Sequence, residues 1–424
     1  MYPKILFITI NGWNNTTGTA TIPSIIQGYP VECVANIFIR ADLPNSPVCD
    51  NYFQISENDV LKSIFRKDVK PGKRIKKSDV ETVAIMNSER TSYLRCKNLH
   101  IPFSSYIRDT IWKFGAWNNV NLQTFIDEFD PDVIMFPAEG SISFLNLAGK
   151  IIERTKKPYL MFFWDDNFTF KCHGFSFYRL MLRNKIARLA DKAASTFAIT
   201  PKMCKECNEY FGITPQMLTR PVSIMNNKEA KEVCNPIQIL YTGSLYIDRD
   251  KTIKTLIRAI REVNTDTLSF YLSIYTNSVV KDAEKKDFNI PGVCELHPGV
   301  PKEEVIKLQS QADILLFVEA LRGKHRNAAR LSFSTKLTDY FAAGKCILAI
   351  APTNIAPTEY LIYRDAALIA DKYKEIIFLL RKIGENTGIV QEYGKKALDC
   401  GIKYHGKKDV LNMFVKAIRK ALNS

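Results

Sequence analysis

The sequence predicts an α/β protein with two Rossmann-like domains, each a doubly wound parallel sheet, facing a central cleft. Short apolar runs bounded by turn residues alternate with segments of helical period along the chain. That alternation is typical of parallel strands joined by helical crossovers. The chain has 424 residues, which exceeds one ordinary core, since domains usually hold about 100 to 200 residues. We therefore expect two domains of comparable size.

The expected strands are short β-rich runs that end in turn residues. In the first half they cover residues 4–10, 132–136, 159–163 and 196–199, and in the second half residues 237–241, 268–275, 314–317 and 346–350. Residues 60–96 contain the basic stretch FRKDVKPGKRIKK, which predicts an exposed insertion. Thr200 and Pro201 predict the start of a helix that ends near Gly212.

The polar stretch MNNKEAKEVCN separates the two halves. We place an N-terminal domain at residues 1–228 and a C-terminal domain at residues 229–404. Residues 405–424 are expected to close the chain as an amphipathic helix, because apolar side chains recur there at helical spacing. These side chains are Val410, Met413, Phe414, Ala417 and Ile418.

Composition is that of an ordinary globular protein with a basic surface. Apolar residues make up 46% and charged residues 24%. The 59 Lys and Arg exceed the 44 Asp and Glu, giving a net charge of +15, which attracts phosphates, anionic lipid or nucleic acid without choosing among them. The scattered cysteines predict free thiols in a reducing compartment, hence a cytoplasmic protein. No apolar run is long enough to predict a membrane span.

One informative segment follows the strand expected at 237–241. It reads YTGSLYIDRDK, so Gly243 and Ser244 form a turn directly after the strand. Ligands sit at the carboxyl ends of strands in open parallel sheets, and glycine allows a close backbone approach. Arg249 and Lys251 at the next helix start can meet a diphosphate from one side. The alternative is an ordinary strand-to-helix turn with solvated charges.

A second informative segment reads RLSFSTKLTDYFAAGKCILAIAP from Arg330 onward. It predicts a polar loop, a short helix, a turn that ends in glycine, and a buried strand. Ser334 and Thr335 stand at the helix start, where free N–H groups and the helix dipole favour an anion. Asp339 lies one turn further along. Helix capping by Ser334 is the alternative, and it is compatible with phosphate binding.

Together, YTGSLYIDRDK and STKLTDYFAAGKCILAI resemble the retaining GT-B glycosyltransferases, specifically the large bacterial family 4, the glycosyltransferase group 1 type. The resemblance implies the GT-B fold and sugar transfer from a nucleoside diphosphate sugar, with retention of configuration. It implies that residues 1–228 form the acceptor-side domain and residues 229–404 the nucleotide-sugar-binding domain. It implies that Arg249 and Lys251 hold the donor diphosphate and that Asp339 holds the ribose. It further implies that the loop at Ser334 and Thr335 supplies N–H groups to the diphosphate.

One position departs from the family pattern. Members often carry a glutamate that contacts donor hydroxyls, but Leu331 occupies its place here. Upstream of it, ALRGKHRNAAR ends in Arg330, which suits a diphosphate or an acidic acceptor. A solvated basic loop is the alternative for this stretch.

In the first half, polar residues follow three of the expected strands. The family places a loop like NGWNNTTGTAT beside the sugar, which points to Gly12 and Gly18. FFWDDNF puts Asp165 and Asp166 at a strand end, where they face the expected cleft, and Glu139 is similarly placed with weaker support. Solvated loop acids are the alternative.

No metal or cofactor is predicted beyond the donor itself. Cys204 and Cys207 form a CxxC without a partner pair, so neither zinc nor redox chemistry is expected. Asp248 and Asp250 match the Asp-x-Asp of metal-dependent transferases, but they follow Gly-Ser-Leu after a strand, which favours the GT-B assignment.

The predicted partners are a nucleotide-sugar donor and a glycan or lipid-linked acceptor, in bacterial surface polysaccharide or glycan assembly. The stretches FSSYIRDTIWKFGAW and SFYRLMLRNKIARLADK suit an anionic membrane interface, so peripheral association with the inner face of a membrane is a hypothesis, with core packing as the alternative. A GT-B-like sugar-nucleotide epimerase and a non-enzymatic basic binding module remain alternatives. Nucleic acid is not expected, since no aromatic and basic sheet motif occurs.

We expect the chemistry to be electrostatic. Arg249, Lys251 and helix-start N–H groups would stabilise the charge that develops on the leaving diphosphate, without a divalent metal. Replacing Arg249 or Lys251 by alanine is then expected to cripple turnover with little loss of folding.

Overall fold

The computed structural model of the chain describes residues 2–14, 21–40, 43–75, 104–169, 176–222, 232–233, 235–265 and 269–423. The chain forms two compact units. Unit 1 contains Met1–Thr219 and Val410–Ser424, and unit 2 contains Arg220–Asp409. Compared with the expected domain limits at 228 and 404, the chain enters unit 2 earlier and returns to unit 1 within its last helix, α16 (Lys407–Leu422).

Unit 1 is built on an 8-stranded sheet with the order β4-β3-β2-β1-β5-β6-β7-β8. All neighbouring strands run parallel except β3 and β4. This confirms an α/β fold with a parallel sheet. The strands are β1 (Ile5–Thr9), β2 (Val34–Phe38), β3 (Asn51–Gln54), β4 (Lys73–Ile75), β5 (Val133–Pro137), β6 (Tyr159–Phe163), β7 (Ser195–Ala198) and β8 (Gln216–Met217).

The strands expected in this half are confirmed as β1, β5, β6 and β7, but β2 and β3 were not predicted. The described residues between β2 and β3, 39–40 and 43–50, form no helix, so the strand–helix alternation that reveals the other strands is missing there. Buried Asn36 also interrupts the apolar run of β2, where it donates a hydrogen bond to Thr9 Oγ1 (2.8 Å).

The expected insertion at residues 60–96 is wrong for its first part, and residues 76–96 lie outside the described residues. Residues 57–65 form helix α2, whose Val60 is fully buried. Residues 73–75 form β4, which pairs antiparallel with β3 and buries Ile75. In this stretch the spacing of the apolar residues therefore predicts the secondary structure better than the charges do.

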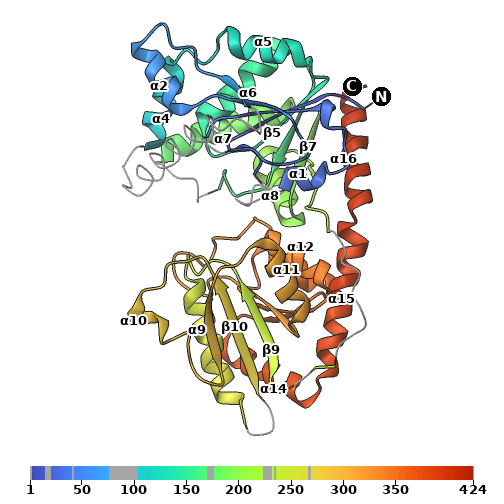
Figure 1. Cartoon of the computed structure of the whole chain (residues 1–424). Helices are drawn as coiled ribbons and strands as arrows, with labels where there is room; N and C mark the ends of the chain where they lie inside the picture. Colours follow the sequence, from blue (N-terminus) through green and yellow to red (C-terminus); the bar gives the residue numbers. More distant parts are fainter. Residues whose placement is uncertain are drawn as a thin grey trace. The chain divides into compact units, whose positions relative to one another are not determined.

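The helices of unit 1 follow the predicted local rules. Thr200 caps α8 by accepting a hydrogen bond from the Met203 N–H, and Gly212 ends that helix with a φ of 67°. In α16, Phe414 is buried and its ring contacts Phe197. The helices are α1 (Thr21–Ile25), α2 (Glu57–Phe65), α4 (Ser104–Phe114), α5 (Val120–Phe129), α6 (Ile142–Thr155), α7 (Ser176–Asp191), α8 (Pro201–Phe211) and the end of α16 (Figure 1).

Unit 2 has a 6-stranded, fully parallel sheet with the order β11-β10-β9-β12-β13-β14. Its strands are β9 (Ile237–Thr242), β10 (Phe270–Thr276), β11 (Cys294–Pro298), β12 (Ile314–Val318), β13 (Cys346–Ile350) and β14 (Leu368–Ala370). Its helices are α9 (Arg249–Val263), α10 (Asp282–Lys285), α11 (Lys302–Gln311), α12 (Thr335–Ala343), α13 (Ala356–Arg364), α14 (Tyr373–Glu385) and α15 (Gly388–His405). The four strands expected in this half are present, and β11 and β14 were not predicted.

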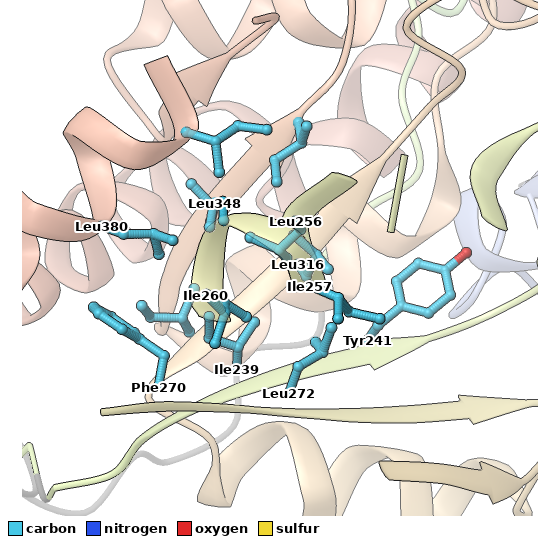
Figure 2. Close-up of a cluster of buried hydrophobic side chains, with 14 of the residues drawn as sticks. Ile239, Tyr241, Leu256, Ile257, Ile260, Phe270, Leu272, Leu316, Leu348 and Leu380 are labelled. Carbon is cyan, nitrogen blue, oxygen red and sulfur yellow. The ribbon is translucent and has the colours of Figure 1, made fainter. Parts of the chain in front are cut away.

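The core of unit 2 lies between one face of this sheet and helices α9 and α14. Figure 2 shows Leu256, Ile257 and Ile260 of α9 packed beside strand residues such as Ile239 and Leu316. The other strand face is covered as well, because α12 and α15 contact β12 and β13. A parallel sheet buried on both faces explains the almost continuous apolar strands.

Both sheets reverse their strand order beside the first strand of their unit. In unit 1 the reversal lies between β1 and β5, and in unit 2 it lies between β9 and β12. In doubly wound sheets, ligands bind at the carboxyl ends of the strands that flank such a reversal. None of the helices in the described part of the chain combines the length and apolarity that crossing a membrane requires.

Candidate functional site

The turn after β9 places Gly243 against a lysine from a distant segment. A Cβ built on Gly243 would lie 1.8 Å from Lys336 Nζ, so a side chain here would displace the lysine. Gly243 has a φ of 153°. The hydroxyl of Tyr241, at the end of the core cluster (Figure 2), donates to the Ser244 carbonyl oxygen (2.6 Å) and fixes the turn.

Arg249 begins α9 and forms a bidentate ion pair with Glu319, which follows β12. Arg249 Nε and Nη2 lie 3.0 and 2.8 Å from the two carboxylate oxygens. The pair is largely buried, since the side chains of Arg249 and Glu319 are 19% and 5% exposed. Arg249 also donates to Ser244 Oγ (3.0 Å). The guanidinium is therefore fixed at the carboxyl edge between β9 and β12.

Lys336 lies in the first turn of α12 and is the second cation at this edge. Its Nζ sits 4.7 Å from the centroid of the Tyr241 ring, an arrangement that favours a cation. Among the described residues, none forms a hydrogen bond or ion pair with this ammonium group. Burial, and then the Arg249 guanidinium, lowers the pKa of Lys336 to about 8. An anion bound here would relieve that penalty.

The start of α12 adds backbone donors beside Lys336. Ser334 is the N-cap residue, but its side chain makes no capping hydrogen bond, so the capping alternative is not observed. The first N–H groups of a helix have no intrahelical acceptor, which leaves those of Thr335 and Lys336 available. Such a helix start favours an anion through its dipole.

Asp339 is one turn further along α12 and is paired with a cation. Arg220 Nη1 lies 3.2 Å from Asp339 Oδ1 and also donates to the Thr335 carbonyl oxygen (3.1 Å). Burial raises the pKa of Asp339, although the Arg220 guanidinium opposes that rise. The carboxylate is 40% exposed, so one oxygen remains accessible to a hydroxyl donor.

Lys251 has a different partner from Arg249. Its Nζ pairs with Asp248 Oδ1 (2.7 Å), and its side chain is 73% exposed. Asp248 also contacts His325 Nδ1 (2.8 Å), and hydrogen bonds from Lys251 and His325 hold its pKa below the usual range. Ile247 and Asp248 have φ values of 55° and 61°, and a β-branched residue in this region is strained. The Lys251–Asp248 pair thus lies on an exposed rim of the loop.

The structure gives less information on three other predicted residues, Arg330, Gly12 and Gly18. The Arg330 carbonyl oxygen accepts a hydrogen bond from the Ala356 N–H (2.9 Å) at the start of α13. Gly12 is buried in the loop after β1. Gly18 lies outside the described residues. Cys204 and Cys207 are free thiols, and no group in the described residues could hold a metal ion.

In unit 1, the reversal between β1 and β5 carries carboxyl groups. Glu139 follows β5, and Asp165 follows the neighbouring strand β6. Burial, and then the charge of Asp165, raises the pKa of Glu139 to about 7, although the Arg40 guanidinium opposes the rise. Asp165 is exposed. A carboxyl group that titrates near neutrality beside an ionisable neighbour is typical of functional sites.

Asp166 has a local structural role. Its carboxylate accepts hydrogen bonds from the Thr169 N–H (3.2 Å) and hydroxyl (2.5 Å). Such a contact stabilises the turn after β6. Asp165 and Asp166 are therefore adjacent in sequence but occupy different surroundings, and Asp165 is the one that acts on Glu139.

Sequence reasoning missed Lys336 and Glu319 as site residues. Lys336 stands between Thr335 and Leu337 in the segment already singled out, but a lysine in a first helical turn is usually solvated. Glu319 directly follows an apolar strand expected to end at the ligand edge. An acidic residue directly after an expected strand is the signal that pointed to Glu139, and the same signal could have pointed to Glu319.

No protein-family model and no curated protein matches the chain. Solved structures do match it. Alr3699/HepE of Anabaena, in complex with UDP, aligns with a TM-score of 0.63 at 9% identity, covering 98% of this chain and 99% of that one. TarM aligns at 0.59 and 8% identity, covering 98% of each chain.

The α,α-trehalose 6-phosphate synthase of Burkholderia multivorans aligns at 0.59 and 8% identity, covering 100% of this chain and 98% of that one. Identities this low show the fold and no more. Two doubly wound units and full-length similarity to these structures lead to one conclusion: the chain has the GT-B fold.

Proposed function

We propose that the chain is a glycosyltransferase whose unit 2 binds a nucleoside diphosphate sugar and whose unit 1 binds an acceptor hydroxyl. The observation that carries the proposal is the Lys336 ammonium group. Lys336 is half-buried at the ligand edge of a GT-B unit, its pKa is lowered by desolvation, and no carboxylate of the described residues forms an ion pair with its ammonium group. Burying an unpaired charge costs stability, and a diphosphate would offset that cost.

The diphosphate would lie between Arg249, Lys336 and the start of α12. Glu319 holds the guanidinium in place, so the cations are already positioned before the charge develops on the leaving group. Preorganised charge of this kind is usually the largest single contribution to catalysis. We propose that the cations of the chain itself neutralise the leaving diphosphate and that the anomeric configuration is retained.

The predicted roles of the other donor-side residues fit the same edge. Gly243 and Ser244 allow close approach of the diphosphate, and Asp339 would accept hydrogen bonds from the ribose diol through its exposed oxygen. Arg330 would add positive charge. Lys251 lies on the rim, so its contribution is expected to be smaller than that of Lys336.

The acceptor would meet the acidic edge of unit 1. Glu139 and Asp165 can accept hydrogen bonds from hydroxyl groups, and we propose that Gly12, in the loop after β1, lies on the same side of the sheet as these acids. With a pKa near 7, Glu139 can also exchange a proton with a hydroxyl near neutral pH. Asp166 would act indirectly, by fixing the turn that presents Asp165.

The acceptor class follows from the surface of unit 1. Helices α2, α4 and α7 expose Phe65, Phe114 and Phe177, which are 81%, 66% and 68% exposed, among lysines and arginines. Aromatic side chains mixed with basic ones suit an anionic membrane interface. We therefore propose peripheral membrane contact and a glycan or lipid-linked acceptor in surface glycan assembly.

UDP is the first donor fragment to test, because complexes of Alr3699/HepE contain UDP and UDP-glucose. We expect UDP, or another nucleoside diphosphate in a panel, to raise the melting temperature of the wild-type chain. The Lys336→Met variant should lose this shift, while Lys251→Ala should keep most of it. Equal shifts in all three proteins would contradict the proposal.

Turnover separates transfer from the epimerase alternative. A transferase consumes its donor in proportion to added acceptor, whereas an epimerase converts its donor without one. Donor conversion that ignores the acceptor would therefore contradict glycosyl transfer while leaving the diphosphate site intact.

A further inference from the structure

Unit 1 contains a concave feature whose lining begins at Ile142 and Ser143, at the start of α6 and just after the carboxyl end of β5. A groove of about 750 Å³ lies among helices α4, α6 and α7, which pack side by side in unit 1 (Figure 1). It follows one face of α6 from Ile142 to Glu153, a length of about 16 Å at the rise of an α-helix. An elongated occupant fits this shape.

Four aromatic residues line the groove: Tyr106, Trp112, Trp117 and Tyr178. Tyr106 and Tyr178 contact edge to face with ring centroids 5.0 Å apart. The Trp117 indole N–H donates to the Trp112 carbonyl oxygen (2.7 Å), and the Tyr178 hydroxyl donates to Asp109 (2.9 Å). These polar atoms are satisfied inside the protein, which leaves ring faces for an apolar occupant.

Two lysines of the groove call for an anionic group on that occupant. Lys113 and Lys185 line the groove, and neither pairs with a carboxylate in the described ranges. Two acids also line the groove: Glu153 pairs with Lys150 (2.7 Å) and raises the pKa of Lys185, and Asp109 accepts hydrogen bonds from the Ser143 N–H (2.9 Å) and the Tyr178 hydroxyl. Arg188, on the same helix as Lys185, adds further positive charge. The groove therefore favours an anion.

Gly149 gives the groove its depth. It lies in the middle of α6, where glycine weakens a helix. A Cβ added there would meet only Lys185 Nζ, at 3.8 Å. Neither backbone conformation nor packing requires glycine at this position. A larger residue would therefore fit the helix but would fill part of the groove.

We propose that this groove binds the alkyl chain of one anionic lipid, with the lipid phosphate on Lys113 and Lys185. The exposed Ile107 and Leu180, on α4 and α7, extend the apolar surface beyond the groove, so a lipid can enter from a bilayer. The site is separate from the donor site and does not depend on glycosyl transfer.

The test uses monododecyl phosphate below its micellar concentration and isothermal titration with the full-length chain. We expect binding of one molecule per chain. Gly149→Phe should weaken it more than tenfold, and Lys185→Gln about fivefold. Gly149→Ala, which adds only a tolerated methyl group, and Lys205→Gln, on exposed α8, should stay within twofold of wild type.

Two further ligands separate the contribution of the alkyl chain to binding from that of the phosphate. Dodecyl maltoside has the same chain and a neutral head, so it should bind at least fivefold more weakly, and inorganic phosphate should not bind measurably. Equal affinity for both amphiphiles, or affinity unaffected by Gly149→Phe, would overturn the proposal. Thermal unfolding by circular dichroism checks that each variant is folded. Lys336→Met should bind the amphiphile like wild type, so failure of the donor site would not be mistaken for failure of the groove.

Discussion

The ligand edges of the two sheets hold the same place in the fold but carry opposite charges. Unit 1 presents Glu139 and Asp165 beside the reversal between β1 and β5, whereas unit 2 presents Arg249 and Lys336 beside the reversal between β9 and β12. Each unit also has a glutamate shortly after its second flanking strand, Glu139 after β5 and Glu319 after β12.

The difference lies in what surrounds each glutamate. Glu319 accepts two hydrogen bonds from Arg249, so it serves to position a cation. Glu139 lies beside another carboxylate, and its pKa is raised to about 7. One topology therefore supports an anion site in one unit and a hydroxyl site in the other, which shows that the side chains, and not the fold, determine the chemistry.

The largest expected effect comes from removing the unpaired cation. Lys336→Met should lower the affinity for UDP and the turnover of a donor roughly 100-fold, as loss of one preorganised charged donor does elsewhere. It should also raise the stability of unit 2 by about 2 kcal/mol, because a buried charge is removed. Titration calorimetry and thermal unfolding measure both.

Two variants serve as controls for this change. Lys251→Ala removes an exposed cation and should change UDP affinity less than threefold, and Glu139→Gln in unit 1 should leave UDP affinity unchanged. An equal loss in Lys251→Ala would mean that the diphosphate lies on the rim of the loop. A loss in Glu139→Gln would mean that the two edges are not chemically separate.

The two glutamates should also differ in their contribution to stability. Glu319→Ala leaves the largely buried Arg249 without its partner and should cost about 3 kcal/mol. For the same reason Arg249→Ala should destabilise unit 2, contrary to the small folding loss expected from the sequence. Denaturant unfolding of each variant measures the difference.

Glu139→Gln should change the free energy of unfolding in the opposite direction to Glu319→Ala. A carboxyl group whose pKa is raised by folding favours the folded state when it is protonated. Its cost therefore grows as the pH rises from its ordinary pKa of 4.5 to about 7 and is constant above that. The substitution should therefore stabilise the chain by about 1 kcal/mol at pH 8 and change little at pH 4. Similar losses in Glu139→Gln and Glu319→Ala would contradict the contrast between the edges.

The two edges should govern different parts of the pH dependence, unit 2 that of UDP affinity and unit 1 that of turnover. Lys336 is protonated below its pKa of about 8, so UDP affinity should be constant at lower pH and fall up to tenfold per unit above it. Turnover should rise as Glu139 ionises near pH 7. Lys336→Met should abolish the fall in UDP affinity above pH 8, and Glu139→Gln should abolish the rise in turnover near pH 7. If one variant abolished both changes, the two edges would titrate together, contrary to the account.

A smaller loss of UDP affinity than that of Lys336→Met is expected at Gly243. In Gly243→Ala, the new methyl group displaces the flexible end of Lys336, and the residue must adopt a φ of 153° that alanine rarely takes, so stability should fall by about 1 to 2 kcal/mol. UDP affinity should fall about fivefold, because the ammonium is moved from its position over Tyr241. Unchanged affinity would show that the close approach to Gly243 is not needed.

Sequence reasoning reached the fold through local signals and missed contacts made between distant segments. The Thr200 cap, the Gly344 turn after α12 and the apolar strand β13 are each encoded within a few residues. The pairing of Arg249 with Glu319 and the approach of Lys336 to Gly243 depend instead on how β9, β12 and α12 come together. No local pattern marks Lys336 as buried.

The central claim is that a diphosphate binds between Lys336, Arg249 and the start of α12. A crystal structure of the chain with UDP tests it most directly. We predict phosphate oxygens within about 3 Å of Lys336 Nζ and of the first N–H groups of α12, the usual distance of charge-assisted hydrogen bonds. UDP bound with its phosphates elsewhere, and Lys336 still without an anionic partner, would contradict the account.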